Sequence, residues 1–242
     1  MKQLLLTLFL LISPSSPRAD MLSLIVFGNS TGTTCSWGVV GSNITLSNSN
    51  NTWTSTSSSQ TSGLGAYGLI AGSGATNSTY LRYFEVTVNS IASDNSSVGI
   101  SNQLQNVNVD ILGNGSGAAI GMGLGPNGAT HYLNSSVGTL FTYTTGAIIG
   151  DAVDFPHQKQ WWTKNGVTWN NDIITNQNPA TNTGGQAFSG GGNTPFGTSN
   201  TGPYYTIYPA FGNNNSGDSM TFNGTGSFSY TLPSGFSAWC SP

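Results

Sequence analysis

The chain has 242 residues and a formal net charge of −3, and only 5% of its residues are charged, against about 25% in an average soluble protein. Nucleic-acid binding requires a basic face, and the 5 Lys and Arg residues are too few to form one. We therefore exclude nucleic acid as a partner. The 6 Trp, 9 Tyr and 11 Phe are spread along the chain. They argue against disorder and for a packed core.

Residues 1–20 are typical of an export signal, with Lys2 at the start, an apolar run over Leu4–Ile12 and a possible cleavage point at Ala19. Two alternatives stay open: Met21 is the true start, or the segment is an uncleaved anchor. The apolar run is too short to span a bilayer, so we expect no stable membrane insertion of the mature domain. The uncharged, hydroxyl- and amide-rich composition favours a secreted protein or one on a virion or cell surface.

From Thr33 onward, short runs rich in Val, Ile, Thr and aromatic residues alternate with Gly, Asn and Ser turns. Many short strands at such spacing predict an all-β sandwich, and no linker divides it, so we expect one domain over residues 35–240. The predicted strands are Asn43–Leu46, Ala66–Ala71, Tyr80–Val88, Ser97–Ser101, Val109–Leu112, Ala118–Met122, His131–Leu133, Thr139–Tyr143, Ala147–Asp154, Gln160–Lys164, Tyr204–Phe211, Ser219–Phe222 and Ser227–Thr231.

Alternation along two predicted strands indicates which side chains face the core. In Tyr80–Val88, Phe84, Val86 and Val88 share one face, and Tyr83, Glu85 and Thr87 share the other. The adjacent Trp161 and Trp162 must point to opposite faces, so we expect one in the core and the other partly exposed. Asn165-Gly166 follows them as a strong turn signal, because both residues tolerate positive φ.

Two cysteines lie near opposite ends of the predicted domain, at Cys35 and Cys240. Export of the chain would favour a disulfide between them, whereas a reducing compartment would leave two buried thiols. The stretch 176–203 differs from the rest, because it holds seven Gly and no charged residue. A loop of this length inside a compact domain is usually functional or disordered.

Several motifs in order resemble those of SPRY domains. They are Tyr83-Phe84-Glu85-Val86-Thr87-Val88, Val98-Gly99-Ile100, the run from Gly150 to Asp154, Trp162-Thr163-Lys164-Asn165-Gly166 and Tyr208-Pro209-Ala210. The ending Phe228 to Phe236 and the opening Asn43 to Ser47 are similar to SPRY-like modules of phage tail and bacterial surface proteins. The resemblance extends from about Trp37 to Trp239.

This resemblance implies a concanavalin-A-like sandwich of two antiparallel sheets that binds partners through loops at one end, without catalysis or a cofactor. It also brings the first and last strands together, which predicts the Cys35–Cys240 disulfide. Two features depart from the family. Asp151 stands where a small or apolar residue is usual, so that it either buries a carboxylate beside Ile149 and Val153 or marks a bulge. The segment Gly191–Gly202 looks like an insertion.

Catalysis and metal binding find little support in the residues. A glycosidase needs two carboxylates beside the scissile bond, and Glu85 is the single Glu of the chain. Asp151 and Asp154 are three residues apart on a strand and so face opposite sides. His131 and His157 belong to no nucleophile motif, and no acidic cluster has the spacing of a calcium site. We therefore expect no enzyme activity, no cofactor and no metal.

Binding of a protein or a surface carbohydrate is the expected function, and aromatic side chains are the candidate contacts. The candidates are Trp169, which follows the Asn165-Gly166 turn, Phe196 on the inserted loop, Tyr132 and Tyr204. The alternatives are a purely structural role, as a decoration of a phage particle or cell surface, and a glycoside hydrolase on a lectin-like fold.

Overall fold

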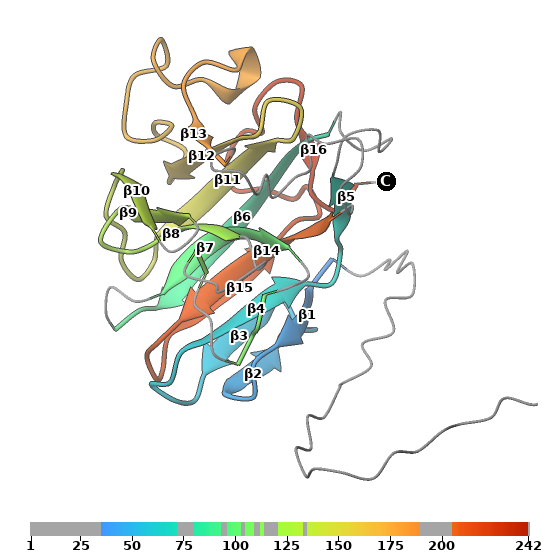
Figure 1. Cartoon of the computed structure of the whole chain (residues 1–242), viewed down its shortest axis with the longest axis vertical. Helices are drawn as coiled ribbons and strands as arrows, with labels where there is room; N and C mark the ends of the chain where they lie inside the picture. The colour runs from blue at the N-terminus through green and yellow to red at the C-terminus, as the bar shows by residue number, and fades with distance from the viewer. Residues whose placement is uncertain are drawn as a thin grey trace, which may run out of the picture.

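The computed structural model describes residues 35–71, 80–92, 96–102, 105–108, 112–113, 121–132, 135–188 and 205–241. These residues form two eight-stranded β-sheets, named A and B below, which confirms the predicted all-β sandwich (Figure 1). Helix in this part of the chain is limited to one 3₁₀ turn, Pro179–Thr181. None of it is a helix of the length and apolarity that crossing a membrane needs.

Sheet A has the strand order β1-β4-β14-β7-β8-β9-β10, and β5 pairs with β14 beside that path. Its strands are β1 (Trp37–Val40), β4 (Thr61–Gly65), β5 (Leu69–Ala71), β7 (Ser97–Asn102), β8 (Gly121–Leu124), β9 (Ala129–Tyr132), β10 (Ser135–Thr139) and β14 (Tyr205–Asn213).

Sheet B has the order β13-β12-β11-β6-β15-β3-β2, and β16 pairs with β6 in the one parallel contact of the described strands. Its strands are β2 (Ile44–Ser47), β3 (Thr52–Ser55), β6 (Leu81–Ser90), β11 (Ile148–Asp154), β12 (Lys159–Lys164), β13 (Gln186–Ala187), β15 (Ser219–Asn223) and β16 (Ser237–Ala238).

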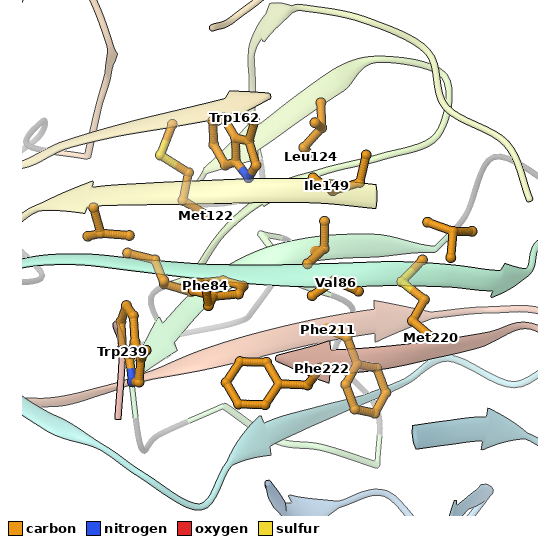
Figure 2. Close-up of a cluster of buried hydrophobic side chains, with 14 of the residues drawn as sticks. Phe84, Val86, Met122, Leu124, Ile149, Trp162, Phe211, Met220, Phe222 and Trp239 are labelled. Carbon is orange, nitrogen blue, oxygen red and sulfur yellow. The ribbon is translucent and has the colours of Figure 1, made fainter. Parts of the chain in front are cut away.

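The core lies between the two sheets and follows the predicted alternation. Phe84, Val86 and Val88 of β6 are fully buried there, and Trp162 of β12 joins them (Figure 2). From sheet A, the Phe211 ring stacks on the Trp53 ring at a centroid distance of 4.3 Å. Burial of these large side chains is the main force that holds the sheets face to face.

Trp161 is fully buried as well, so the prediction of one partly exposed tryptophan in this pair is wrong. Its ring lies on the outer face of sheet B, where Gly185 approaches it so closely that a Cβ would stand 2.6 Å from a ring atom. The indole Nε1 donates to the Thr183 carbonyl at 3.0 Å. A loop of the same chain therefore covers the face that alternation alone would expose.

The predicted strand Ser227–Thr231 is also wrong, because this segment binds a carboxylate instead of a neighbouring strand. Glu85, 2% exposed on the outer face of β6, accepts the backbone N–H of Ser229 at 2.7 Å and that of Tyr230 at 3.0 Å. The Tyr83 hydroxyl donates to the same carboxylate at 3.0 Å. The single Glu of the chain thus fastens the C-terminal segment onto sheet B.

Other strand boundaries also differ from the prediction. Thr139–Tyr143 is strand only at Thr139, and the Tyr143 hydroxyl donates to the Leu124 carbonyl from a buried coil position. The strands β1, β3, β4, β13 and β16 were not predicted. Ser, Thr and Gly dominate β3 and β4 and mimic loop composition, and β13 and β16 have only two residues each. Most of Val109–Leu112 and Ala118–Met122 lies outside the described residues.

A disulfide joins Cys35 to Cys240, with their Cα atoms 5.7 Å apart, and this confirms the predicted pairing. Its cysteines are 205 positions apart in sequence. The backbone N–H of Cys240 also donates to the Gly224 carbonyl at 3.0 Å. The bridge thus ties the residue before β1 to the segment that covers sheet B.

Asp151 lies on the inner face of β11 and is fully buried, so the departure from the family pattern buries a carboxyl group and does not mark a bulge. The pairing of β11 with β6 and β12 runs without a register shift. Gln160 Nε2 donates to Asp151 Oδ2 at 2.7 Å. Burial raises the pKa of Asp151 well above its ordinary value, and the hydrogen bond from Gln160 and the nearby Trp162 indole oppose part of that rise.

Candidate binding surface

One loop of the sandwich combines a rigid internal structure with exposed apolar side chains. Residues 165–185, called the 165–185 loop below, leave β12 at one end of the sandwich and return to β13; Figure 1 draws the loop in orange. It starts at the predicted turn, where Asn165 has φ 53° and Gly166 has φ 65°. These left-handed angles suit asparagine and glycine and turn the chain back over β12.

Asn170 is the central anchor of the 165–185 loop. It is buried, and its side-chain Oδ1 accepts the Trp162 N–H at 2.9 Å while its own N–H donates to the Trp162 carbonyl at 2.7 Å. Its Nδ2 donates to Gln177 Oε1 at 3.0 Å, and the same oxygen accepts the Gly185 N–H at 2.9 Å. Two amide side chains, those of Asn170 and Gln177, therefore join the middle and the end of the loop to strand β12.

Short backbone contacts complete this frame. Trp169 pairs with Thr163 on one side and with Asp172 on the other, and Asn178 pairs with Thr183 around the 3₁₀ turn. Asn178 also caps that turn, because its Oδ1 accepts the Ala180 N–H at 3.0 Å. A loop with this many internal hydrogen bonds holds its shape before any partner arrives.

Three aliphatic side chains project from this frame into solvent. Val167 is 78% exposed, Ile173 is 61% exposed and Ile174 is 58% exposed. The antiparallel bridge between Trp169 and Asp172 reverses the chain direction. Val167 precedes this bridge by two residues, and Ile173 follows it directly. Single exposed apolar residues are common on proteins, but three of them on one fixed loop form a candidate contact surface. We call these three residues the aliphatic surface.

The structure places the residues predicted for ligand contact differently. Trp169 is half-buried, and its ring packs edge-on against Tyr83 of β6 with centroids 6.3 Å apart, so it fixes the 165–185 loop to sheet B. Tyr132 is buried in the core and donates to the Phe188 carbonyl at 2.7 Å, which corrects its assignment as a ligand contact. Phe196 and Tyr204 lie outside the described residues, as does Gly191–Gly202.

Sequence reasoning missed the aliphatic surface because it searched for aromatic residues. The available signal was the pair Ile173-Ile174 in a run of Asn and Thr that fits neither strand alternation nor a core position. Such apolar residues between turn signals are either buried by the loop itself or displayed by it. Only the fold of the loop decides between the two.

A polar depression of about 390 Å³ adjoins the start of the 165–185 loop. It is lined by residues 142–147 and by Lys164 and Asn165. Asn165 links these two segments, since its Oδ1 accepts the Ile148 N–H at 2.9 Å and its N–H donates to the Ile148 carbonyl at 2.8 Å.

Two acidic side chains of the described part of the chain, Asp154 and Asp218, hold neighbouring segments by hydrogen bonds. Asp154 accepts the His157 N–H and contacts the exposed His157 ring at 2.8 Å, and Asp218 accepts the Ser96 hydroxyl and the Ala92 N–H. No group of three or more His, Cys, Asp or Glu side chains among the described residues is arranged to hold a metal ion. The arrangement offers contact surface and hydrogen-bond donors to a partner.

Comparison with known proteins finds no matching family model and no matching curated protein. Among solved structures, the chain is similar to the SPRY domain of human HERC1, with 14% identity and a TM-score of 0.49 over 74% of this chain and 91% of that one. It is also similar to a human SPRY domain (15% identity, TM-score 0.46, 75% of this chain and 94% of that one) and to the TRIM65 PSpry domain (11%, 0.46, 78% and 90%).

All three of these structures are SPRY domains, the family that the sequence motifs resemble. None of these three structures is a phage tail or bacterial surface module. At such identities the likeness says nothing about what this chain binds.

Proposed function

We propose that this protein is a non-catalytic binding module that recognises a protein partner through the aliphatic surface of the 165–185 loop. The observation that carries the proposal is the exposure of Val167, Ile173 and Ile174 on a loop that many backbone hydrogen bonds hold in place. Exposed aliphatic side chains gain free energy when a partner covers them. A loop that is already ordered loses little conformational entropy on binding, which favours affinity.

The chemistry of the surface favours a protein over a carbohydrate. Sugar rings are commonly held by exposed aromatic faces, whereas the large apolar side chains that are exposed among the described residues are all Val or Ile. Aliphatic side chains pack against apolar side chains of another protein. Asp172 is the one acidic residue of the 165–185 loop, so the contact area is almost uncharged, as the centre of a protein interface usually is.

We further propose that the module works outside the cytoplasm, either secreted or on a virion or cell surface. The Cys35–Cys240 disulfide supports this location, because such bonds persist in oxidising compartments. The apolar run near the N-terminus has the pattern of an export signal. Expression of the full chain and mass spectrometry of the exported product would test both the location and the cleavage.

The binding proposal is tested by selecting a random peptide display library on the purified domain. Bound peptides are then measured against the triple variant V167S/I173S/I174S and against the control V39S/V137S, which changes the other exposed large apolar side chains of the described residues. We expect the triple variant to lose at least about tenfold in affinity, as for the loss of interface contact residues, while the control binds like the parent.

Equal peptide binding by the triple variant would contradict the proposed surface. A glycan array is measured in parallel. Binding of sugars without binding of peptides would show that the ligand is a carbohydrate. A lack of binding in both assays would favour a purely structural, decorating role. Activity of the domain on polysaccharides would contradict the non-catalytic proposal and favour a hydrolase.

A further inference from the structure

The polar depression beside the 165–185 loop holds an ammonium group that lacks a carboxylate partner. Lys164 is half-buried, and its Nζ donates to the Thr142 carbonyl at 2.9 Å and lies 5.8 Å from the centroid of the Phe141 ring. Within the described residues, no carboxylate oxygen lies within 4.0 Å of this nitrogen. An ammonium group has three N–H donors, so the bond to Thr142 leaves two that can donate to an anion.

Other polar side chains line the same depression. Thr144 and Thr145 are exposed residues of its lining, and each carries a hydroxyl group. Thr145 Oγ1 already accepts the Ile91 N–H at 3.1 Å, so its hydroxyl hydrogen points elsewhere. Asn165 is exposed and accepts the Ile148 N–H through Oδ1, and its Nδ2 group is a further donor of the lining. A small pocket with a cation and several N–H and O–H donors suits a carboxylate, which only accepts hydrogen bonds.

This depression also adjoins the aliphatic surface. Asn165 precedes Val167 by two positions, so their Cα atoms are at most about 7 Å apart. One short segment of a partner can therefore contact both. We propose that the depression at Lys164 is a carboxylate subsite of the binding surface, and that the protein partner presents an acidic side chain beside its apolar contact residues. This inference rests on the proposed function.

Because the chain has few charged residues, Lys164 has few competing cations nearby. The other half-buried lysine of the described residues, Lys159, donates to the Asn182 carbonyl at 3.1 Å, and its Nζ lies 5.9 Å from the Trp161 ring centroid. Arg82 is buried and donates to the Ala238 carbonyl. Lys164 is thus the cation that lies at the depression, and its charge acts almost without competition.

A direct test uses N-acetyl-glutamate amide as the probe and backbone amide signals as the readout. NMR titration of the domain should shift the signals of Ile148 and Asn165, in the parent and in the control K159Q. In K164Q the shifts should fall by at least about twofold, which is the size expected for a partly exposed ion pair. Added salt should reduce the shifts in the parent, because it screens the pair.

Several results would overturn the inference while leaving the proposed function intact. They are the absence of shifts, equal shifts in K164Q and the parent, or stronger shifts from glucuronic acid than from the amino-acid probe, which would indicate an acidic sugar. The peptides selected on the aliphatic surface give an independent reading. We expect them to be enriched in Asp and Glu and to bind K164Q about two- to fivefold more weakly than K159Q. Peptides without this enrichment, and with equal affinity for both variants, would also overturn it.

Discussion

Replacing Asp151 with asparagine tests how a buried carboxyl group limits the stability of this sandwich. The raised pKa keeps Asp151 protonated in the folded protein, whereas in the unfolded chain the group ionises near its ordinary pKa of about 3.9. Above that pH the folded state binds more protons than the unfolded state. The contribution of Asp151 is therefore fully present below the ordinary pKa, and it is lost as pH rises toward the raised pKa of the fold.

The expected magnitude follows from the linkage between pKa and stability. Within this window the free energy of unfolding of the parent falls by about 1.4 kcal/mol per pH unit because of Asp151 alone. The variant D151N cannot ionise and keeps an acceptor for Gln160 Nε2. Its advantage over the parent should therefore grow as pH rises above the ordinary pKa of the carboxyl group, by up to about 1.4 kcal/mol per pH unit, or about 3–6 °C in Tm for a chain of this size.

Urea denaturation of both proteins at several pH values measures this difference, and the other acidic groups cancel because both proteins share them. A stability difference that stays constant with pH, or that shrinks as pH rises, would refute the reasoning. The variant D151V is a useful contrast. It leaves the buried Gln160 amide without its partner, so we expect it to be less stable than D151N by about 1–3 kcal/mol.

Two further outcomes follow from contacts elsewhere in the fold. Reducing the Cys35–Cys240 disulfide opens a loop that the chain-entropy model values at about 5 kcal/mol, so Tm should fall by roughly 10–20 °C, and an unchanged Tm would show that the bridge adds little. Asn170→Ala removes two side-chain hydrogen bonds at a residue with φ 47°, so limited proteolysis should cut the 165–185 loop faster, and Asn170→Gly, which suits that φ, should be cut at an intermediate rate.

Local patterns in the sequence determined the fold class and its main features. Alternation in β6 identified the inward Phe84, Val86 and Val88, because strand geometry sends successive side chains to opposite faces. The Asn165-Gly166 turn was also local, because positive φ at both positions depends on the residues themselves. The disulfide followed from the resemblance to a known fold, which brings the ends of the chain together.

Contacts between distant segments decided the rest, and no local pattern encodes them. Trp161 and Glu85 belong to an outward face by alternation, yet both are buried, because the 165–185 loop and the C-terminal segment cover sheet B. Ser227–Thr231 has strand-like residues, but its N–H groups bind Glu85, and Ser229 is 144 positions away from that carboxylate. The aliphatic surface is the converse case. Ile173 is as apolar as a core residue, and it is exposed only because Asn170 fixes the loop that carries it.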